Sequence, residues 1–181
     1  MRIISRTPIA TIDPVTTTAL ADHLRIESTE TTSAMAYVSA AALELEQYAD
    51  IALLSQTIVA EATATEAASL SLILPIGPLL DTPTIAAINA DGSTTAITTA
   101  ITSVGQYPVV TLAEDPGLPV RVTYAAGYGP DEDDIPRDLS MAILDQTLRL
   151  YDKRGDMDEH PRLAPSAARI CARYRRVRMG V

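Results

Sequence analysis

Residues 120–136, with the sequence VRVTYAAGYGPDEDDIP, contain the strongest structural signals in the chain. Apolar side chains stand at every second position of 120–126, which is the period of a half-buried β-strand. Gly127 and Gly129 then favour a backbone turn with a positive φ. Pro136 follows a run of acidic residues and stands where the first turn of a helix accepts a proline. The stretch therefore predicts a strand, a glycine turn and a new helix in immediate succession.

Helical patterns lie on both sides of a region with strand patterns. Residues 16–26 begin with threonines that can cap a helix, and apolar residues recur at steps of three and four in 30–49. A third helix is expected over 136–153. Between about 54 and 126 the apolar residues alternate, and Asp91-Gly92 is typical of a hairpin turn. We expect an α+β fold, in which a bundle of an N-terminal helix pair and the C-terminal helices carries an inserted antiparallel β-rich region.

Charge is distributed unevenly along the 181 residues. The chain has 14 basic and 23 acidic residues and a net charge of −9, yet residues 161–181 contain six arginines and no acid, so the remainder carries −9 − 6 = −15. We expect one domain over 1–165 and an Arg-rich helix or tail over 166–181. A basic amphipathic helix suits a protein groove, nucleic acid or a membrane surface, or is simply solvated. A membrane surface is the least favoured partner, because the apolar stripe of this helix lacks the Trp, Phe and Leu that membrane-surface helices bury. Of the remaining partners, a protein groove is favoured.

The residues that usually carry catalysis are scarce. His23 and His160 are the only histidines, Cys171 is the only cysteine, and no nucleophile or metal-ligand motif surrounds them. The acidic run 131–134 lacks the ligand spacing of a calcium-binding loop. The sequence therefore predicts a protein that is not an enzyme and binds no cofactor or metal. A lone thiol is consistent with synthesis in a reducing cytoplasm, and no stretch is apolar enough to suggest a membrane span.

Several short motifs occur in a characteristic order. They are Pro14-Val15-Thr16, HLRIE at 23–27, LLSQT at 53–57, Asp91-Gly92, VTYAAGYG at 122–129, Ile135-Pro136 and YDKR at 151–154. In this order and spacing the chain resembles the head-tail connector, or adaptor, proteins of long-tailed bacteriophages, including those of gene transfer agents. The resemblance extends over most of the chain.

The resemblance implies a structural role in the neck of a phage or phage-like particle. Such proteins form a homo-oligomeric ring, twelve-fold in the particle, that joins the portal protein to stopper or tail proteins and extends the DNA channel. An acidic body suits a channel wall, because DNA must slide through without being held at its phosphates. We therefore expect no specific DNA binding. Two alternatives remain: a tail-completion or stopper protein, and a DNA-binding module that uses the Arg-rich helix.

Three sets of residues follow as candidate sites. The C-terminal segment is expected to bind the portal, and deletion of 166–181 to leave a folded body. The broad apolar arc of the third helix is expected to contact neighbouring subunits. The portal-binding set is Arg169, Ile170, Arg173, Tyr174, Arg175, Arg176, Val177 and Arg178; the subunit-contact set is Met141, Leu144, Leu148 and Tyr151; the structural-turn set is Gly127, Gly129 and Pro136.

Overall fold

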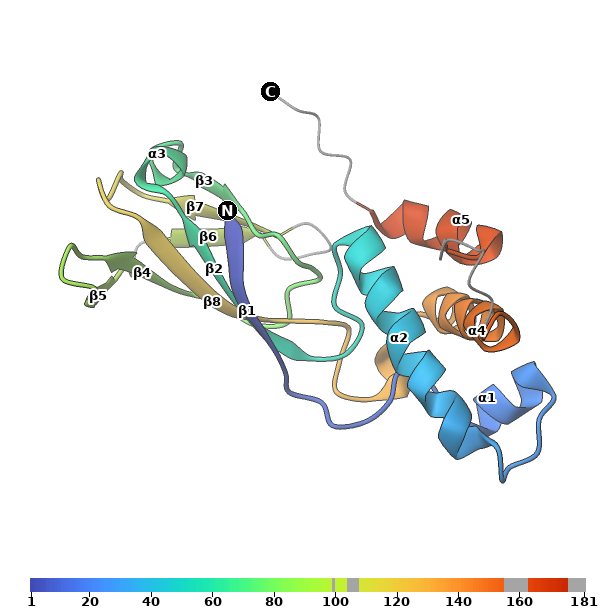
Figure 1. Cartoon of the computed structure of the whole chain (residues 1–181). Coiled ribbons are helices and arrows are strands. Elements are labelled where there is room, and N and C mark those ends of the chain that lie inside the picture. Colours follow the sequence, from blue (N-terminus) through green and yellow to red (C-terminus); the bar gives the residue numbers. More distant parts are fainter. Residues whose placement is uncertain (99, 104–107, 155–162, 176–181) are drawn as a thin grey trace. The chain divides into compact units, whose positions relative to one another are not determined.

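A computed structural model describes residues 1–98, 100–103, 108–154 and 163–175. The chain divides into two compact units, each built from two segments (Figure 1). The β unit consists of Met1–Ala10 and Ser55–Tyr128, and the helical unit consists of Thr11–Leu54 and Gly129–Val181. Helices and antiparallel sheets occur together in one chain, so the expected α+β class is confirmed.

The larger sheet of the β unit is antiparallel throughout its described strands. Its order is β1-β2-β8-β4-β5, so the central strand β8 pairs with both β2 and β4. In β2 and β8 every second residue is buried, which is the alternation that identified residues 120–126 as a strand. The strands are β1 (Arg2–Pro8), β2 (Gln56–Ala62), β4 (Thr84–Ile88), β5 (Thr94–Ala96) and β8 (Val120–Ala126).

The predicted hairpin around Asp91-Gly92 is present and joins β4 to β5. Gly92 has φ 85°, and the Asp91 side chain accepts a hydrogen bond from the backbone N–H of Ser93 at 2.9 Å. A positive φ of this kind is accessible to glycine at little cost, which explains why the turn falls at this dipeptide.

A second, three-stranded antiparallel sheet completes the β unit. Its order is β3-β7-β6, formed by Ser71–Ile73, Val109–Leu112 and Ala100–Ser103. Tyr124 in β8 is buried, and its hydroxyl donates to the carbonyl of Ile76 and accepts from the N–H of the same residue, both at 3.2 Å. These bonds satisfy the only polar group of a buried ring, and burial raises the pKa of Tyr124.

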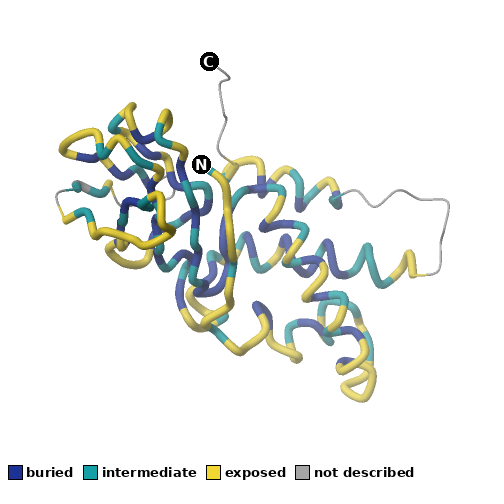
Figure 2. The backbone as a smooth tube through the Cα atoms, turned by 60° about the vertical axis from the view of Figure 1, so that its left-hand side comes forward, coloured by how far each residue is buried: buried dark blue, intermediate teal, exposed yellow. Residues whose placement is uncertain are grey.

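β1 is a strand that the sequence did not reveal. None of its seven residues is buried, it lies at one end of the larger sheet, and the pairing with β2 shifts register between Ile3 and Ser5. Figure 2 shows this strand as an exposed trace leading from the N-terminus. An edge strand without a buried face has no reason to alternate apolar and polar residues, so no period-2 pattern marks it in the sequence.

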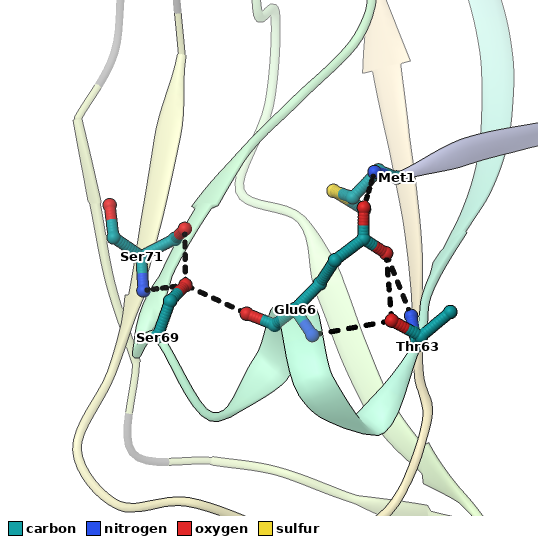
Figure 3. A network of polar contacts seen from close by, with 5 residues as sticks. All are labelled: Met1, Thr63, Glu66, Ser69 and Ser71. Atoms are coloured by element: carbon teal, nitrogen blue, oxygen red, sulfur yellow. Dashed lines mark hydrogen bonds and ion pairs between the residues drawn. The ribbon is translucent and has the colours of Figure 1, made fainter. Parts of the chain in front are cut away.

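The short helix α3 (Ala64–Ala67) fastens the start of β1 within the β unit (Figure 3). The Thr63 hydroxyl accepts from the N–H of Glu66, and the Glu66 carboxylate accepts in return from the N–H of Thr63, which is a capping box. The other carboxylate oxygen of Glu66 lies 2.5 Å from the amino group of Met1. The hydrogen bond from this amine and that from Thr63 lower the pKa of Glu66.

Glu66→Gln is expected to lower the melting temperature more at pH 7 than at pH 3. Because the folded-state pKa of Glu66 is lowered, its carboxylate stabilises the fold above the ordinary pKa of glutamate, and this contribution is lost as the pH falls through the lowered value. Thermal unfolding of both proteins at the two pH values measures the difference. An equal difference at both pH values would contradict the assignment.

The helical unit starts with two helices connected by a short turn. α1 (Thr17–Leu24) is capped by the Thr16 hydroxyl, which accepts from the N–H of Ala19 at 3.1 Å. The C-cap residue that follows α1 is Arg25, with φ 55°, and the one that follows α2 (Thr31–Ala49) is Asp50, with φ 56°. Both helices therefore end in a left-handed residue that is not glycine, which explains why the sequence gives no obvious end for the first one.

α4 (Arg137–Asp152) is the central helix of the helical unit. It contacts α1, α2 and α5 (Pro165–Tyr174), and α2 also contacts α5 (Figure 1). Leu139, Ala142 and Ile143 of α4 are fully buried. Three helices around one axis require a wide apolar surface on that helix, so the broad arc of α4 has an explanation within a single copy.

Candidate docking site on the helical unit

α5 carries the residues that the sequence singled out for binding a portal. The helix begins at Pro165, where a proline is tolerated, and ends at Tyr174. Ala167, Ile170 and Cys171 are buried, whereas Arg169, Arg173 and Arg175 are exposed. Arg176, Val177 and Arg178 lie outside the described residues. The apolar stripe of α5 therefore packs into its own unit and leaves the arginines outside.

The C-terminal end of α5 is tied to the first turn of α4. The Tyr174 hydroxyl donates to Oδ1 of Asp138 at 2.7 Å, and Nη2 of Arg173 lies 3.1 Å from Oδ2 of the same carboxylate. Partial burial and the hydrogen bond to Asp138 raise the pKa of Tyr174 to about 12. The guanidinium of Arg175 lies over the ring of Tyr48 in α2, 5.1 Å from its centroid. Two elements of the unit thus hold this end of the helix.

These contacts divide the predicted portal-binding set. Ile170 belongs to the interior of the helical unit, and Tyr174 is engaged by Asp138. The burial of Ile170 and Cys171 also argues against the expectation that deletion of 166–181 leaves a folded body, because that deletion would expose apolar surface of α4 and α2. Among the described residues, the exposed arginines of α5 are those available to a partner.

The predicted subunit-contact set is similarly divided. Leu144 is buried inside the helical unit, and Tyr151 makes an edge-to-face contact with Tyr37 of α2, with ring centroids 5.7 Å apart. Leu148 is partly exposed, and Met141 is exposed over 47% of its surface. Met141 is the member of this set that most clearly offers apolar surface to a neighbouring molecule.

A buried amide connects three parts of the helical unit. Gln146 of α4 is fully buried, and its Nε2 donates to Oε2 of Glu44 in α2 at 2.6 Å. Its Oε1 accepts from the N–H of Ala164 at 2.6 Å, immediately before α5. Since a buried amide is costly unless both its ends are bonded, this residue fixes how the chain enters α5 against α2.

The turn that leads into α4 uses its two glycines in different ways. Gly127 has φ 137°, a conformation that L side chains rarely adopt. Gly129 has no such φ, but a Cβ added to it would lie 2.0 Å from Oδ2 of Asp134. Asp134 is fixed because its carboxylate caps the backbone N–H of Asp131 at 3.1 Å. Pro136 is the residue just before α4, so the helix starts one position later than the predicted range 136–153.

Gly129→Ala is expected to destabilise the protein by about 1–3 kcal/mol, because the new methyl group collides with Asp134 and displaces the cap of the 3₁₀ turn at Glu132–Asp134. Urea unfolding measures the change. The control is Ala172→Ser on the exposed side of α5, for which a change within about 0.5 kcal/mol is expected. Equal stabilities for Gly129→Ala and the parent protein would show that the turn relaxes freely.

An open groove lies beside this turn, on the side of α4 formed by Arg137, Ser140 and Leu144. Its volume is about 460 Å³. Val15, Ile135 and Leu144 line it but are themselves buried, and Glu132, Asp133 and Arg137 line its edge. Within the described part of the chain, the side chains of Glu132 and Asp133 form no hydrogen bond or ion pair.

The candidate reactive groups are spread through the structure. His23 Nε2 lies 3.3 Å from Oδ1 of Asp145 without hydrogen-bond geometry, and burial raises the pKa of the Cys171 thiol to about 11. Across the ranges that the structure covers, no group of three His, Cys, Asp or Glu side chains could hold a metal ion. No helix within those ranges has the length and apolarity needed to cross a membrane.

Comparison with known proteins finds similarity through structure only. No protein-family model and no curated protein matches the sequence. A chain in the virion of a native gene transfer agent particle superposes with a TM-score of 0.78 at 20% identity, covering 97% of each chain. The chain shares the fold of a gene transfer agent protein. Matches in necks of these particles have TM-scores of 0.77 for an empty particle computed with C6 symmetry and 0.73 for a native particle computed with C12 symmetry.

The match to the gene transfer agent fold covers both units. The matched chain in the neck of the empty particle is 20% identical, and the superposition covers 97% of each chain. The matched chain in the neck of the native particle is 22% identical, and the superposition covers 99% of this chain and 97% of that one. Nearly the whole chain therefore corresponds to nearly the whole of each match, so α5 and the β unit belong to the shared fold.

Proposed function

We propose that this chain is a structural subunit of the neck of a phage-like particle, of the head-tail connector type. The observation that supports it most is the full-length likeness to chains from gene transfer agent particles, two of them in particle necks. The motifs at 122–129 and 135–136 point to the same class independently of the structure. The residues that could carry catalysis are few and dispersed, which suits a role based on shape and contact.

Copies of the chain form a ring in this proposal. The neck structures that share its fold were computed with C6 and C12 symmetry, and cyclic symmetry is how identical subunits surround an axis. The ring lies beneath the portal, contacts stopper or tail proteins below, and lets DNA pass through its centre. A net charge of −9 discourages tight contacts to DNA phosphates, so passage requires no specific binding.

The exposed arginines of α5 form the portal-binding surface in this proposal, together with the basic residues that follow them. Arg169 and Arg175 are exposed, and guanidinium groups bind carboxylates through paired hydrogen bonds. Ile170 supports this surface from inside by holding α5 on α4. Binding therefore depends on the arginines directly and on the buried stripe indirectly.

Charge reversal on α5 tests the portal contact. Arg169→Glu combined with Arg175→Glu is expected to reduce co-sedimentation with portal rings of the same particle at least tenfold. The melting temperature should fall only slightly, because the contact of Arg175 with the Tyr48 ring is lost while the buried stripe of α5 stays in place. Arg2→Glu combined with Arg25→Glu makes the same charge change at exposed positions elsewhere and is the control. Undiminished binding by the α5 variant would reject the docking surface.

A map of the intact particle tests the wider proposal. Density for this fold is expected in a ring at the vertex where the tail joins the head. Its position directly below the portal would distinguish a connector from a stopper. Absence of the chain from the particle would reject a neck role altogether, and tight, salt-sensitive binding of duplex DNA by the purified protein would favour the DNA-binding alternative.

A further inference from the structure

The larger sheet of the β unit has two unlike edges. Its order runs from β1 at one end to β5 at the other, and no described strand lies beyond either of them (Figure 1). No residue of β1 or β5 is buried. The backbone N–H and C=O groups on the outer side of such a strand have no partner within the sheet. Each edge can therefore accept one more strand.

The regular part of the β1 edge is short. The pairing with β2 shifts register between Ile3 and Ser5, and Pro8 has no N–H to donate. Residues 5–7 are thus left as an uninterrupted run between an irregularity and a proline. The opposite edge has the same length, because β5 consists of the three residues Thr94–Ala96.

Charge separates the possible partners of this run. If the β1 edges of two copies paired antiparallel about Arg6, the two Arg6 side chains would lie directly opposite each other, and like charges so placed destabilise a sheet. β5 has no charged residue, and the charged residue nearest to it in sequence is Asp91 of the hairpin turn. The β5 edge is therefore a better match for the β1 edge than a second β1.

The symmetry of an assembly depends on whether the joined surfaces are the same or different. A surface that pairs with itself closes two copies and stops, whereas two different surfaces joined head to tail produce a ring. The ring of the proposed function requires two unlike surfaces on each copy. The two ends of one sheet provide such a pair.

We infer that β5 of one copy adds to the β1 edge of the next copy beside residues 5–7, so that the larger sheets of neighbouring copies are joined. The role of this contact in a ring rests on the proposed function. Three residues supply only a few hydrogen bonds, so free copies associate weakly. The contact forms fully where a particle holds the copies close together.

Cysteine cross-linking tests the contact. The strand registers place Ser5 and Thr94 on the same face of the sheet, and both residues are exposed. Particles that carry Ser5→Cys together with Thr94→Cys are treated with a short bismaleimide at neutral pH. Cys171 reacts little under these conditions, because it is buried and its pKa is raised to about 11.

The double variant is expected to give a ladder of dimers, trimers and larger products on a denaturing gel. Particles assembled from an equal mixture of the two single variants should stop at dimers, and each single variant alone should give monomers. Ser5→Cys combined with Ser33→Cys, at an exposed position of α2, is the control and should give no ladder.

A second pair guards against a local effect of either cysteine. Thr7→Cys with Ala96→Cys lies on the same face of the same two edges and should also give a ladder. Absence of a ladder from both pairs would overturn the inference. Dimers from Ser5→Cys alone would overturn it as well, because they would show that β1 pairs with itself.

The same reaction with concentrated purified protein separates this inference from the proposed function. If the chain is present where the tail joins the head but neither pair gives a ladder, the edge contact fails and the neck role stands. If the purified protein gives the ladder while particles contain no copy of the chain, the edge contact stands and the neck role fails.

Discussion

Ile170→Ala is expected to lower the free energy of unfolding by about 2–5 kcal/mol, the range for truncating a buried isoleucine to alanine. Ile170 is only 7% exposed and packs between α5 and the rest of the helical unit, next to the fully buried Cys171 and Ala167. The substitution leaves a cavity that the neighbouring helices fill only in part. Urea unfolding followed by circular dichroism measures the loss.

Arg169→Ala is the matched control, because it removes a side chain from the exposed side of the same helix. A change within about 0.5 kcal/mol is expected for it. The pair also separates two roles of α5. Ile170→Ala should weaken portal binding only at temperatures where the helical unit loosens, whereas loss of an exposed arginine should weaken it at every temperature. A cost below about 1 kcal/mol for Ile170→Ala would contradict the packing of α5 on α4.

Gln146→Met is expected to destabilise the protein by about 2–4 kcal/mol, although methionine has nearly the same shape. The substitution removes the acceptor of the Ala164 N–H and the donor to Glu44. The Ala164 N–H is buried and loses its acceptor, which costs about 1–3 kcal/mol, and the half-buried Glu44 loses a donor as well. Gln47→Met makes the same change at an exposed position of α2 and should stay within about 0.5 kcal/mol.

Hydrogen exchange of the Ala164 amide gives a second readout for Gln146→Met. With its acceptor gone, this amide should exchange faster than in the parent protein, while amides in the centre of β8 keep their rates. A parent-like exchange rate would show that another acceptor or a water replaces the glutamine. The stability loss would then have to come from packing alone.

The sequence by itself determined the elements whose patterns arise from burial on one side. α2 spans Thr31–Ala49 where apolar spacing predicted 30–49, and β8 spans Val120–Ala126 where alternation predicted a strand. The Asp91-Gly92 hairpin belongs to the same group, because its turn depends on the backbone freedom of one residue. Each of these patterns arises within a single helix, strand or turn. It can therefore be recognised in the sequence without knowing which other element packs against it.

Only the tertiary structure decided which surface each apolar stripe meets. The sequence marked Ile170 and Leu144 as apolar positions, yet it could not tell a contact within one copy from a contact with a portal or a neighbour. β1 was not predicted from the sequence, because an exposed edge strand is held by backbone hydrogen bonds. These bonds do not require an alternation of apolar and polar side chains. Burial determines which positions are apolar, and this is visible in the sequence. Which element covers an apolar position is determined by packing between segments far apart in the sequence, such as those that carry Glu44 and Gln146.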